Sequence, residues 1–409
     1  MDSKHLKKTP SLLGGGMIIA GTIIGGGMLA LPIATAGIGY YRSILLLFFS
    51  WFCMSYSGLM LLEANLHYPE GASFDTLVKD LLGKKWNILT GLSIAFVLYT
   101  LTYAYITVGG SITHTLLGDT IGLESSTSSI LFCLFLATFV WFSTQTVDRV
   151  STLLITAMVI SFFAMTTGLL GEINLNLLFE TNTPTFSQSN LIYFFIALPV
   201  CVTSFGFHGN VPSLVSYYNR DGKKIEKSIL LGSAIALLIY ALWQTSIYGN
   251  LPSSELLNIQ NAEDDIGLMI EKLSSHVQVD LLSHTIGFFT YAAIISSFLG
   301  VALGLFDYIA DLFSIKDTKA GRFKTALLTF VPPLLASLFF PYGFTIAISY
   351  VGFGASIWAI IVPALLVVKS RKKFPQGAYK VFGGYTLVYL ILLFGGLTIT
   401  SIFISLLVA

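Results

Sequence analysis

Few side chains in the long apolar segments of this sequence can carry charge, and they set the first hypotheses about its chemistry. His208 lies in a glycine-rich segment and could titrate near neutral pH, although a histidine satisfied within the fold is an equally good interpretation. Asp307 and Asp311 are one helical turn apart, and they could form a gate with a basic loop residue or simply face water. Glu63, near the end of an apolar segment, is interpreted as half of a structural or gating ion pair.

A second group of residues could supply oxygen atoms to a cation. The hydroxyl groups of Ser296 and Ser297 and the carbonyl group of Ala293 are spaced to lie on one face of a helix. The carbonyl groups of Gly21 and Ile24 could complete a set of oxygen ligands, and hard oxygen ligands suit a sodium ion. Serine-mediated helix packing is the alternative explanation.

Two glycine-rich segments interrupt apolar runs. The first spans residues 14–27 and is followed by Pro32; within it we interpret Gly14–Gly16 as close helix packing and residues 21–27 as the interruption. The second spans residues 203–210 and is followed by Pro212. Glycine costs a helix about 1 kcal/mol relative to alanine. Irregular backbone at membrane depth is tolerated only where it is buried in protein or lines a cavity. We therefore predict a broken helix at each segment, with close helix packing as the alternative.

Broken helices would offer backbone groups as ligands. Amide groups at the start of a half-helix favour an anion, and free carbonyl groups at the end of one favour a cation. The amide groups that we expect to bind a carboxylate are those of Gly25, Gly26 and Gly27. The carbonyl groups that we expect to bind an ammonium group are those of Ile23, Thr203 and Phe205.

Aromatic residues near these segments could form the walls of a pocket for a flat, apolar ligand. The candidate wall residues are Tyr99, Tyr103, Tyr105, Phe205, Phe207, Phe353 and Trp358. Because 14% of the chain is aromatic, packing is the alternative explanation for each of them.

The composition predicts the kind of scaffold that must position these groups. The chain of 409 residues is 55% hydrophobic and only 11% charged, whereas a soluble domain is about 25% charged. This composition predicts a membrane protein. We expect its three cysteines to be buried free thiols. The first apolar run is too long for a signal peptide. Metal-protease and serine-hydrolase motifs are absent from the sequence, which argues against an enzyme. A channel built from one chain fits less well than a carrier.

Apolar runs and basic loops predict an all-α protein with eleven transmembrane helices. All but two of the 22 Lys and Arg residues, the exceptions being Arg42 and Lys272, fall on one side when the N-terminus is placed in the cytoplasm. The C-terminus is then outside. The predicted spans are 11–40, 42–66, 87–117, 128–146, 150–171, 190–218, 228–250, 281–313, 324–340, 343–368 and 384–408.

The two interruptions fall in the first and the sixth predicted spans. Five spans in each half, with the second half starting from the opposite side, predict a five-plus-five inverted repeat with a binding site between the broken helices. The predicted units are a cytoplasmic tail (1–10), a first repeat (11–171), a second repeat (190–368) and an extra C-terminal helix (384–408).

Several stretches resemble a known family. They include IIAGTIIGGGMLALP (18–32), EANLHY (63–68), SFGFHGNVPSLVSYY (204–218) and SSFLGVALGLFDYIADLF (296–313). The chain resembles the bacterial aromatic amino acid permeases over nearly its whole length, and it is most similar to the tryptophan-specific members. The resemblance implies an inner-membrane symporter of the amino acid–polyamine–organocation fold that imports an aromatic amino acid, most simply tryptophan, with tyrosine as the alternative.

The resemblance also bears on energy coupling. Met158 stands where enterobacterial relatives carry a lysine that could exchange protons. A methionine at this position disfavours simple proton coupling and favours the predicted sodium ligands around Ser296 and Ser297. Both H⁺ and Na⁺ stay possible as the coupling ion. We expect no cofactor, no metal other than Na⁺, no nucleic acid and no obligatory protein partner, only the substrate and the lipid bilayer.

Overall fold

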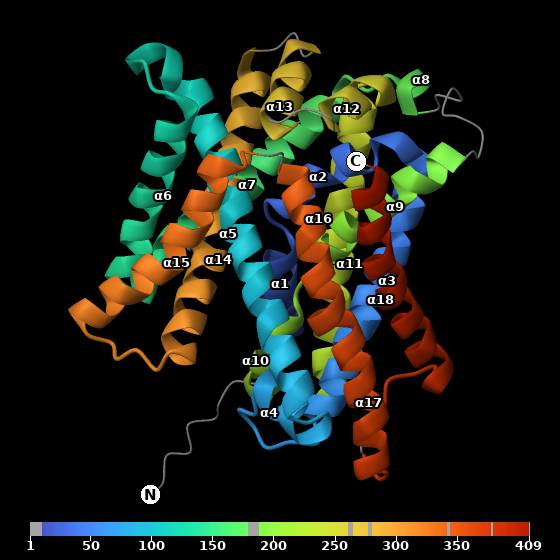
Figure 1. The fold of residues 1–409 in the computed structure, drawn as a ribbon. Coiled ribbons are helices and arrows are strands. Elements are labelled where there is room, and N and C mark those ends of the chain that lie inside the picture. Colours follow the sequence, from blue (N-terminus) through green and yellow to red (C-terminus); the bar gives the residue numbers. More distant parts are fainter. Residues whose placement is uncertain are drawn as a thin grey trace, which may run out of the picture.

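The computed structural model describes residues 10–178, 188–260, 265–276, 280–341, 344–377 and 379–408, and within these ranges it is helical and has no strand (Figure 1). Among the described residues, nine helices are long and apolar enough to cross a membrane, or ten if the bent pair α1 and α2 counts as one span. The predicted span 324–340 lies in α15 (Lys319–Phe339), which is not among them. Three basic residues in its first two turns, Lys319, Arg322 and Lys324, account for this.

The helices of the first half follow the predicted spans and add one short surface helix and a helix of one turn. They are α1 (Leu12–Ile23), α2 (Gly27–Ala34), η1 (Ala36–Ile38), α3 (Tyr40–Asn65), α4 (Phe74–Leu81), α5 (Lys84–Ile121), α6 (Ser125–Phe142), α7 (Thr144–Gly171) and α8 (Leu175–Leu178).

The second half adds two short helices, α12 and α13, that precede its third long helix. The elements are α9 (Gln188–Ser204), η2 (His208–Asn210), α10 (Val211–Tyr217), α11 (Gly222–Tyr248), α12 (Ser253–Gln260), α13 (Asp265–His276), α14 (Asp280–Leu312), α15, α16 (Phe344–Ala355), the π-helical η3 (Ser356–Ile361), α17 (Val362–Lys373) and α18 (Gly384–Val408).

Both predicted helix breaks are present. The helix α1 ends at Ile23 and α2 begins at Gly27, with a bend of 58° between the two. The helix α9 ends at Ser204 and is followed by irregular backbone at residues 205–207. Pro212 then lies in the first turn of α10, where a missing N–H group costs nothing.

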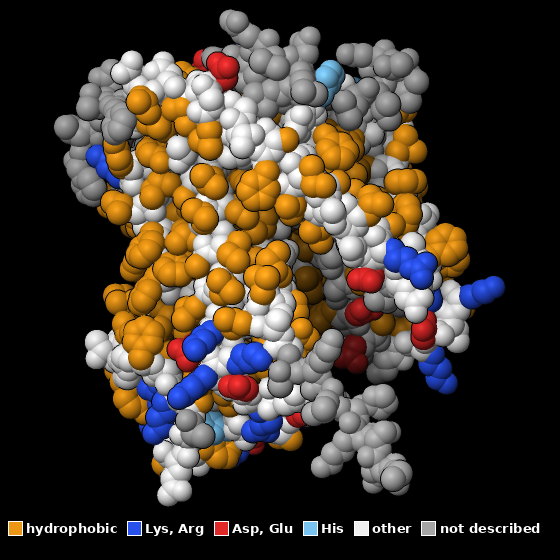
Figure 2. Space-filling model, turned by 180° about the vertical axis from the view of Figure 1, so that it is seen from behind, with side chains coloured by type: hydrophobic (Ala, Val, Ile, Leu, Met, Phe, Trp, Pro, Cys, Tyr) orange, Lys and Arg blue, Asp and Glu red, His pale blue; other side chains and the backbone are white. Residues whose placement is uncertain are grey.

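The helices form two groups joined by α5 (Figure 1). In one group α14 packs on α7 and α15 packs on α6, while in the other α11 packs on α1 and α3, and α9 packs on α16 and α18. The described chain starts at the lower end in Figure 1 and finishes at the upper end with α18. Lys and Arg side chains gather at the lower end of the face in Figure 2.

A hydrogen bond between helices stabilises α15 where two prolines interrupt it. Pro332 has no N–H group, so the carbonyl group of Leu328 four residues earlier loses its helical donor. The hydroxyl group of Tyr99 in α5 donates to this carbonyl at 2.8 Å. At the start of α15, Arg322 donates to the carbonyl groups of Val140 and Trp141 at the end of α6. These contacts fix α15 against α5 and α6.

Candidate functional site

The two helix breaks lie against each other in the core. The side chain of Ser204, the last residue of α9, donates to the carbonyl group of Val200 at 2.8 Å and reaches the carbonyl group of Gly27 at 3.4 Å. Asn210, in η2 after the second break, donates to the hydroxyl group of Thr22 in α1. The two breaks, which are far apart in the sequence, therefore lie together in the structure.

Tyr240 in α11 joins the two breaks. Its side chain is fully buried, and its hydroxyl group lies 2.6 Å from the carbonyl oxygen of Ile23 and 2.9 Å from that of Ser204. Tyr240 is not among the residues that the sequence predicted for the site. The only available signal was that a tyrosine buried in an apolar helix needs a hydrogen-bond partner, which does not say where the partner is.

The amide groups of the first break are largely free. The N–H group of Gly26 donates to the hydroxyl group of Ser297 in α14 at 2.9 Å. The N–H groups of Gly25 and Gly27 have no acceptor in the described part of the chain. Because these groups precede or open α2, they carry the positive end of its dipole. Their predicted role as ligands of a carboxylate stays a prediction.

The predicted carbonyl ligands differ in how far they are already engaged. Ile23 accepts from Tyr240, and Thr203 accepts from the N–H group of Gly206 at 3.2 Å. The carbonyl groups of Phe205, Gly21 and Ile24 have no donor among the described residues. The two breaks thus hold carbonyl groups with partial negative charge as well as amide groups with partial positive charge.

The residues proposed for a sodium site come from two places: Gly21 and Ile24 lie at the end of α1, and Ala293, Ser296 and Ser297 lie on α14. Ser296 donates to the carbonyl group of Ala293 at 3.2 Å, while Ser297 contacts the first break through Gly26. Met158 is buried in α7, which packs along α14. The described residues include no group of His, Cys, Asp or Glu that could hold a metal ion. Any cation site here must therefore use carbonyl and hydroxyl oxygens.

The structure brings only some of the aromatic residues to the breaks. Tyr105 in α5 lies at the first break, because a Cβ atom on Gly26 would come within 2.6 Å of its ring. Tyr103 instead donates to the carbonyl group of Phe340 and lines a cleft of about 520 Å³ between α5, α15 and α16. Phe353 has Phe96 and Phe403 as ring neighbours, and both of these are exposed on the outer surface.

The second break is aromatic and buried. Phe205 packs against the ring of Tyr240 with 5.3 Å between centroids, and Phe207 stacks on His208 at 4.8 Å. The imidazole of His208 is fully buried, and neither ring nitrogen has a partner in the described part of the chain. Its other ring neighbour is Trp358 in η3, at 6.0 Å. His208 therefore belongs to an aromatic cluster beside the break.

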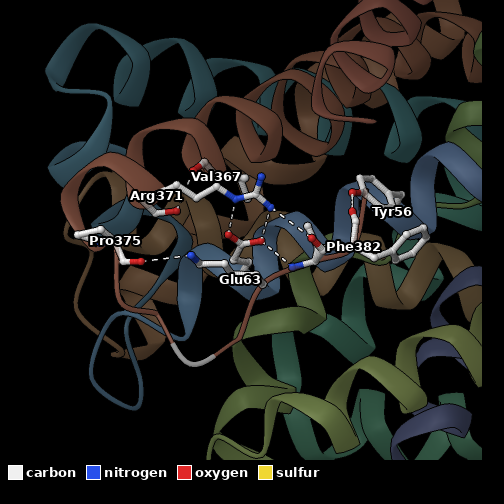
Figure 3. Close-up of polar contacts among 9 residues, drawn as sticks. Tyr56, Glu63, Val367, Arg371, Pro375 and Phe382 are labelled. Atoms are coloured by element: carbon white, nitrogen blue, oxygen red, sulfur yellow. Dashed lines mark hydrogen bonds and ion pairs between the residues drawn. The ribbon is translucent and has the colours of Figure 1, made fainter. Parts of the chain in front are cut away.

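Glu63, predicted as a gating residue, forms a buried ion pair with Arg371 of α17 (Figure 3). The guanidinium donates through Nε at 2.7 Å and through a terminal nitrogen at 2.9 Å. The N–H group of Val381 also donates to Glu63 at 2.8 Å, and Tyr56 donates to the carbonyl group of Phe382. The carboxylate thus joins α3 to α17 and to the connection before α18.

The two aspartates on α14 have a different environment. Asp307 and Asp311 are exposed, and so are Gly300 and Gly304, which lie two turns and one turn before Asp307 on the same helix. Neither aspartate forms an ion pair with any described residue. Figure 2 shows a hollow in the lower half of the molecule, with acidic and basic side chains gathered beside it. Their predicted role in gating stays a prediction.

These features define an integral membrane protein in which two broken helices form a polar site among apolar spanning helices, an arrangement typical of secondary transporters. The tryptophan/tyrosine permease family matches residues 8–402, and the chain belongs to this family. It is therefore a transport protein and not an enzyme. Its apolar helices, together with the bacterial origin of its relatives, indicate an inner-membrane protein.

Three relatives illustrate the range of similarity. The tryptophan-specific transport protein of Haemophilus influenzae is 56% identical over 402 residues, which cover 97% of this chain and 96% of that protein. A tryptophan-specific transport protein of Pseudomonas aeruginosa is 48% identical, covering 95% of this chain and 93% of that protein. The tyrosine permease of Enterobacter agglomerans is 39% identical, with 95% of each chain covered.

Proposed function

We propose that this protein imports tryptophan across the inner membrane by cation-coupled alternating access. The observation that carries the proposal is the joined pair of breaks, where among the described residues the amide groups of Gly25 and Gly27 have no acceptor and the carbonyl groups of Ile24 and Phe205 have no donor. A zwitterionic amino acid needs both kinds of group, and helix ends supply them without the cost of charged side chains in the membrane.

The choice of tryptophan rests on the relatives. The two tryptophan-specific transport proteins are 56% and 48% identical to this chain, and the tyrosine permease is 39% identical. Tyrosine is the alternative substrate. The aromatic residues Tyr105 and Phe205 beside the breaks suit the flat side chain of either amino acid.

The helix contacts support a five-plus-five inverted repeat with α15 as one of eleven spans. In such a repeat α5 corresponds to α14, and α7 corresponds to α16 and α17. The contact of α14 with α7 then has its counterpart in the contact of α5 with α16. Corresponding helices also meet in pairs, since α3 packs on α11, α5 on α14 and α6 on α15.

We further propose Na⁺ as the coupling ion, bound by the carbonyl groups of Gly21, Ile24 and Ala293 and the hydroxyl groups of Ser296 and Ser297. Met158 cannot carry a proton, which disfavours H⁺ coupling at that position. The N-terminus is proposed to face the cytoplasm, because short loops rich in Lys and Arg remain inside. The C-terminus then faces outward.

The test is uptake of radiolabelled tryptophan into proteoliposomes under an imposed Na⁺ gradient and, separately, an imposed H⁺ gradient. We expect accumulation with Na⁺ and counterflow exchange, which a channel would not give. Accumulation with H⁺ alone would transfer the coupling role to His208, Asp307 or Glu63. Uptake of tyrosine without tryptophan would overturn the substrate.

Substitution at α14 tests the ion site within the same assay. Ser297→Ala is expected to raise the Na⁺ concentration required for half-maximal uptake, because one proposed oxygen ligand is lost. Val301→Ala, a change on the same helix outside the proposed oxygen set, is the control. An unchanged Na⁺ response in Ser297→Ala would rule out this ligand.

A further inference from the structure

Tyr240 is held at the point where two helix ends face each other. The helix α1 ends at Ile23 and α9 ends at Ser204, and the phenolic oxygen is 2.6 Å and 2.9 Å from their carbonyl oxygens. Packing fixes the ring, since Tyr240 is fully buried and its centroid is 5.3 Å from that of Phe205. The hydroxyl group therefore has two acceptors within reach and little freedom to leave either of them.

At Tyr240 there are fewer hydrogen-bond donors than acceptors. A phenolic hydroxyl group has one proton, so it satisfies one of the two carbonyl groups fully or shares its proton between them. Both carbonyl groups are at helix C-termini, where partial negative charge favours a cation. A primary ammonium group brings three donors and a full charge to the same place.

We propose that Tyr240 is a positioning residue that competes with the ammonium group of the substrate for the carbonyl group of Ile23. This inference rests on the proposed function. Without an amino acid, the hydroxyl group ties the two breaks together. When an ammonium group binds the Ile23 carbonyl, the hydroxyl group donates to Ser204 alone. Tyr240 thus lowers the affinity for the substrate by the free energy of one shared hydrogen bond, and it holds the two breaks together when no substrate is bound.

A series of donors at position 240 tests the competition. Tyr240→Phe removes the donor, and 3-fluorotyrosine, introduced by codon suppression, is a more acidic and therefore stronger donor. The dissociation constant for tryptophan on the purified protein is expected to rise from phenylalanine to tyrosine to fluorotyrosine. With a net hydrogen bond contributing about 1 kcal/mol, the phenylalanine variant should bind about fivefold more tightly than the wild type.

Tyr248 supplies the matched control on the same helix. It is also fully buried, but its hydroxyl group meets Thr35 at 3.0 Å and no carbonyl group of either break. For the same replacements at position 248, the dissociation constant for tryptophan should not follow the donor strength of the side chain. The two positions together separate competition at the break from a general effect of removing a buried hydroxyl group.

Transport gives a second readout that a structural role would not produce. Tyr240→Phe should retain tryptophan exchange but lose much of its net uptake, because net uptake requires the unliganded carrier to return.

The proposal is overturned if the wild-type protein, with tyrosine at position 240, binds tryptophan more tightly than both the phenylalanine and the fluorotyrosine variants. The hydroxyl group would then only support the fold. If the phenylalanine variant does not fold, the order of tyrosine and fluorotyrosine still decides. Failure of the wild type to bind tryptophan at all would instead refute the proposed function.

Discussion

The helix breaks and the Glu63–Arg371 junction place polar groups in the protein core in opposite ways. At the breaks the ligands are amide, carbonyl and hydroxyl groups, and in the described residues the only ionisable side chains among them are tyrosine and histidine. At the junction a carboxylate with no exposed surface meets a guanidinium that is 11% exposed, and the connection before α18 covers both. One region uses dipoles and the other uses full charges.

The difference fits the roles that we propose for the two regions. A substrate site must release its ligand, and dipoles at helix ends attract charged groups without leaving an unpaired charge behind. A fixed junction never opens its pair, so two charges with good geometry can repay their loss of water. Strong bidentate pairing should therefore be found where helices stay together, and free backbone groups where they do not.

The largest expected effect is steric and tests the breaks. In Gly26→Ala the new Cβ atom would lie 2.6 Å from the ring of Tyr105, whereas in Gly27→Ala its nearest neighbour, Ser204, is 3.8 Å away. Overpacking costs about 1–3 kcal/mol, so we expect Gly26→Ala to lower tryptophan uptake about tenfold or more, with protein still in the membrane. Gly27→Ala should retain uptake. Equal activity in the two variants would refute the assigned geometry.

Disrupting the Glu63–Arg371 pair should lower the stability of the protein more than it lowers transport. Arg371→Ala leaves the buried carboxylate of Glu63 unpaired, which costs about 3–5 kcal/mol. We expect a clear fall in the melting temperature of the detergent-solubilised protein. Lys373→Ala on the same helix is the control, because its pair with Asp80 is exposed and worth at most about 1 kcal/mol. Similar losses in both variants would contradict the contrast between buried and exposed pairs.

The smallest effect is a pH dependence at the surface. Hydrogen bonds from Lys373 and then Tyr68 lower the pKa of Asp80 below its ordinary value of 3.8. A lowered pKa in the folded state stabilises the protein above the ordinary pKa, and this contribution is lost as the pH falls through the lower value. Asp80→Asn should therefore reduce the loss of melting temperature between about pH 4 and pH 3. An identical acid profile in the variant would show that the pair contributes nothing.

The sequence was sufficient to locate the breaks but not to orient the helices around them. The glycine clusters before Pro32 and Pro212 indicated irregular backbone, so the first break was predicted at the residues that contact Ser297 and Ser204. Helix α5 is apolar on nearly every face, and its sequence does not say whether Tyr103 or Tyr105 points inward. The structure brings Tyr105 to the break.

Long-range partners were beyond the sequence for a related reason. Glu63 was expected to form an ion pair, yet its partner lies 308 residues away and has several basic neighbours in the sequence. Tyr240 makes its contacts through backbone carbonyl groups, which every residue possesses. Neither pairing leaves a pattern that spacing or composition could reveal.

The N–H group of Val381, which donates to Glu63, has a mechanical consequence for the last helix. It ties the connection before α18 to α3, while α18 also packs on α9 and η3. These elements should therefore travel as one rigid body during the transport cycle. The distance between spectroscopic labels on α3 and at the start of α18 should stay constant during transport. The distance between a label on either of these elements and one on α14 should change.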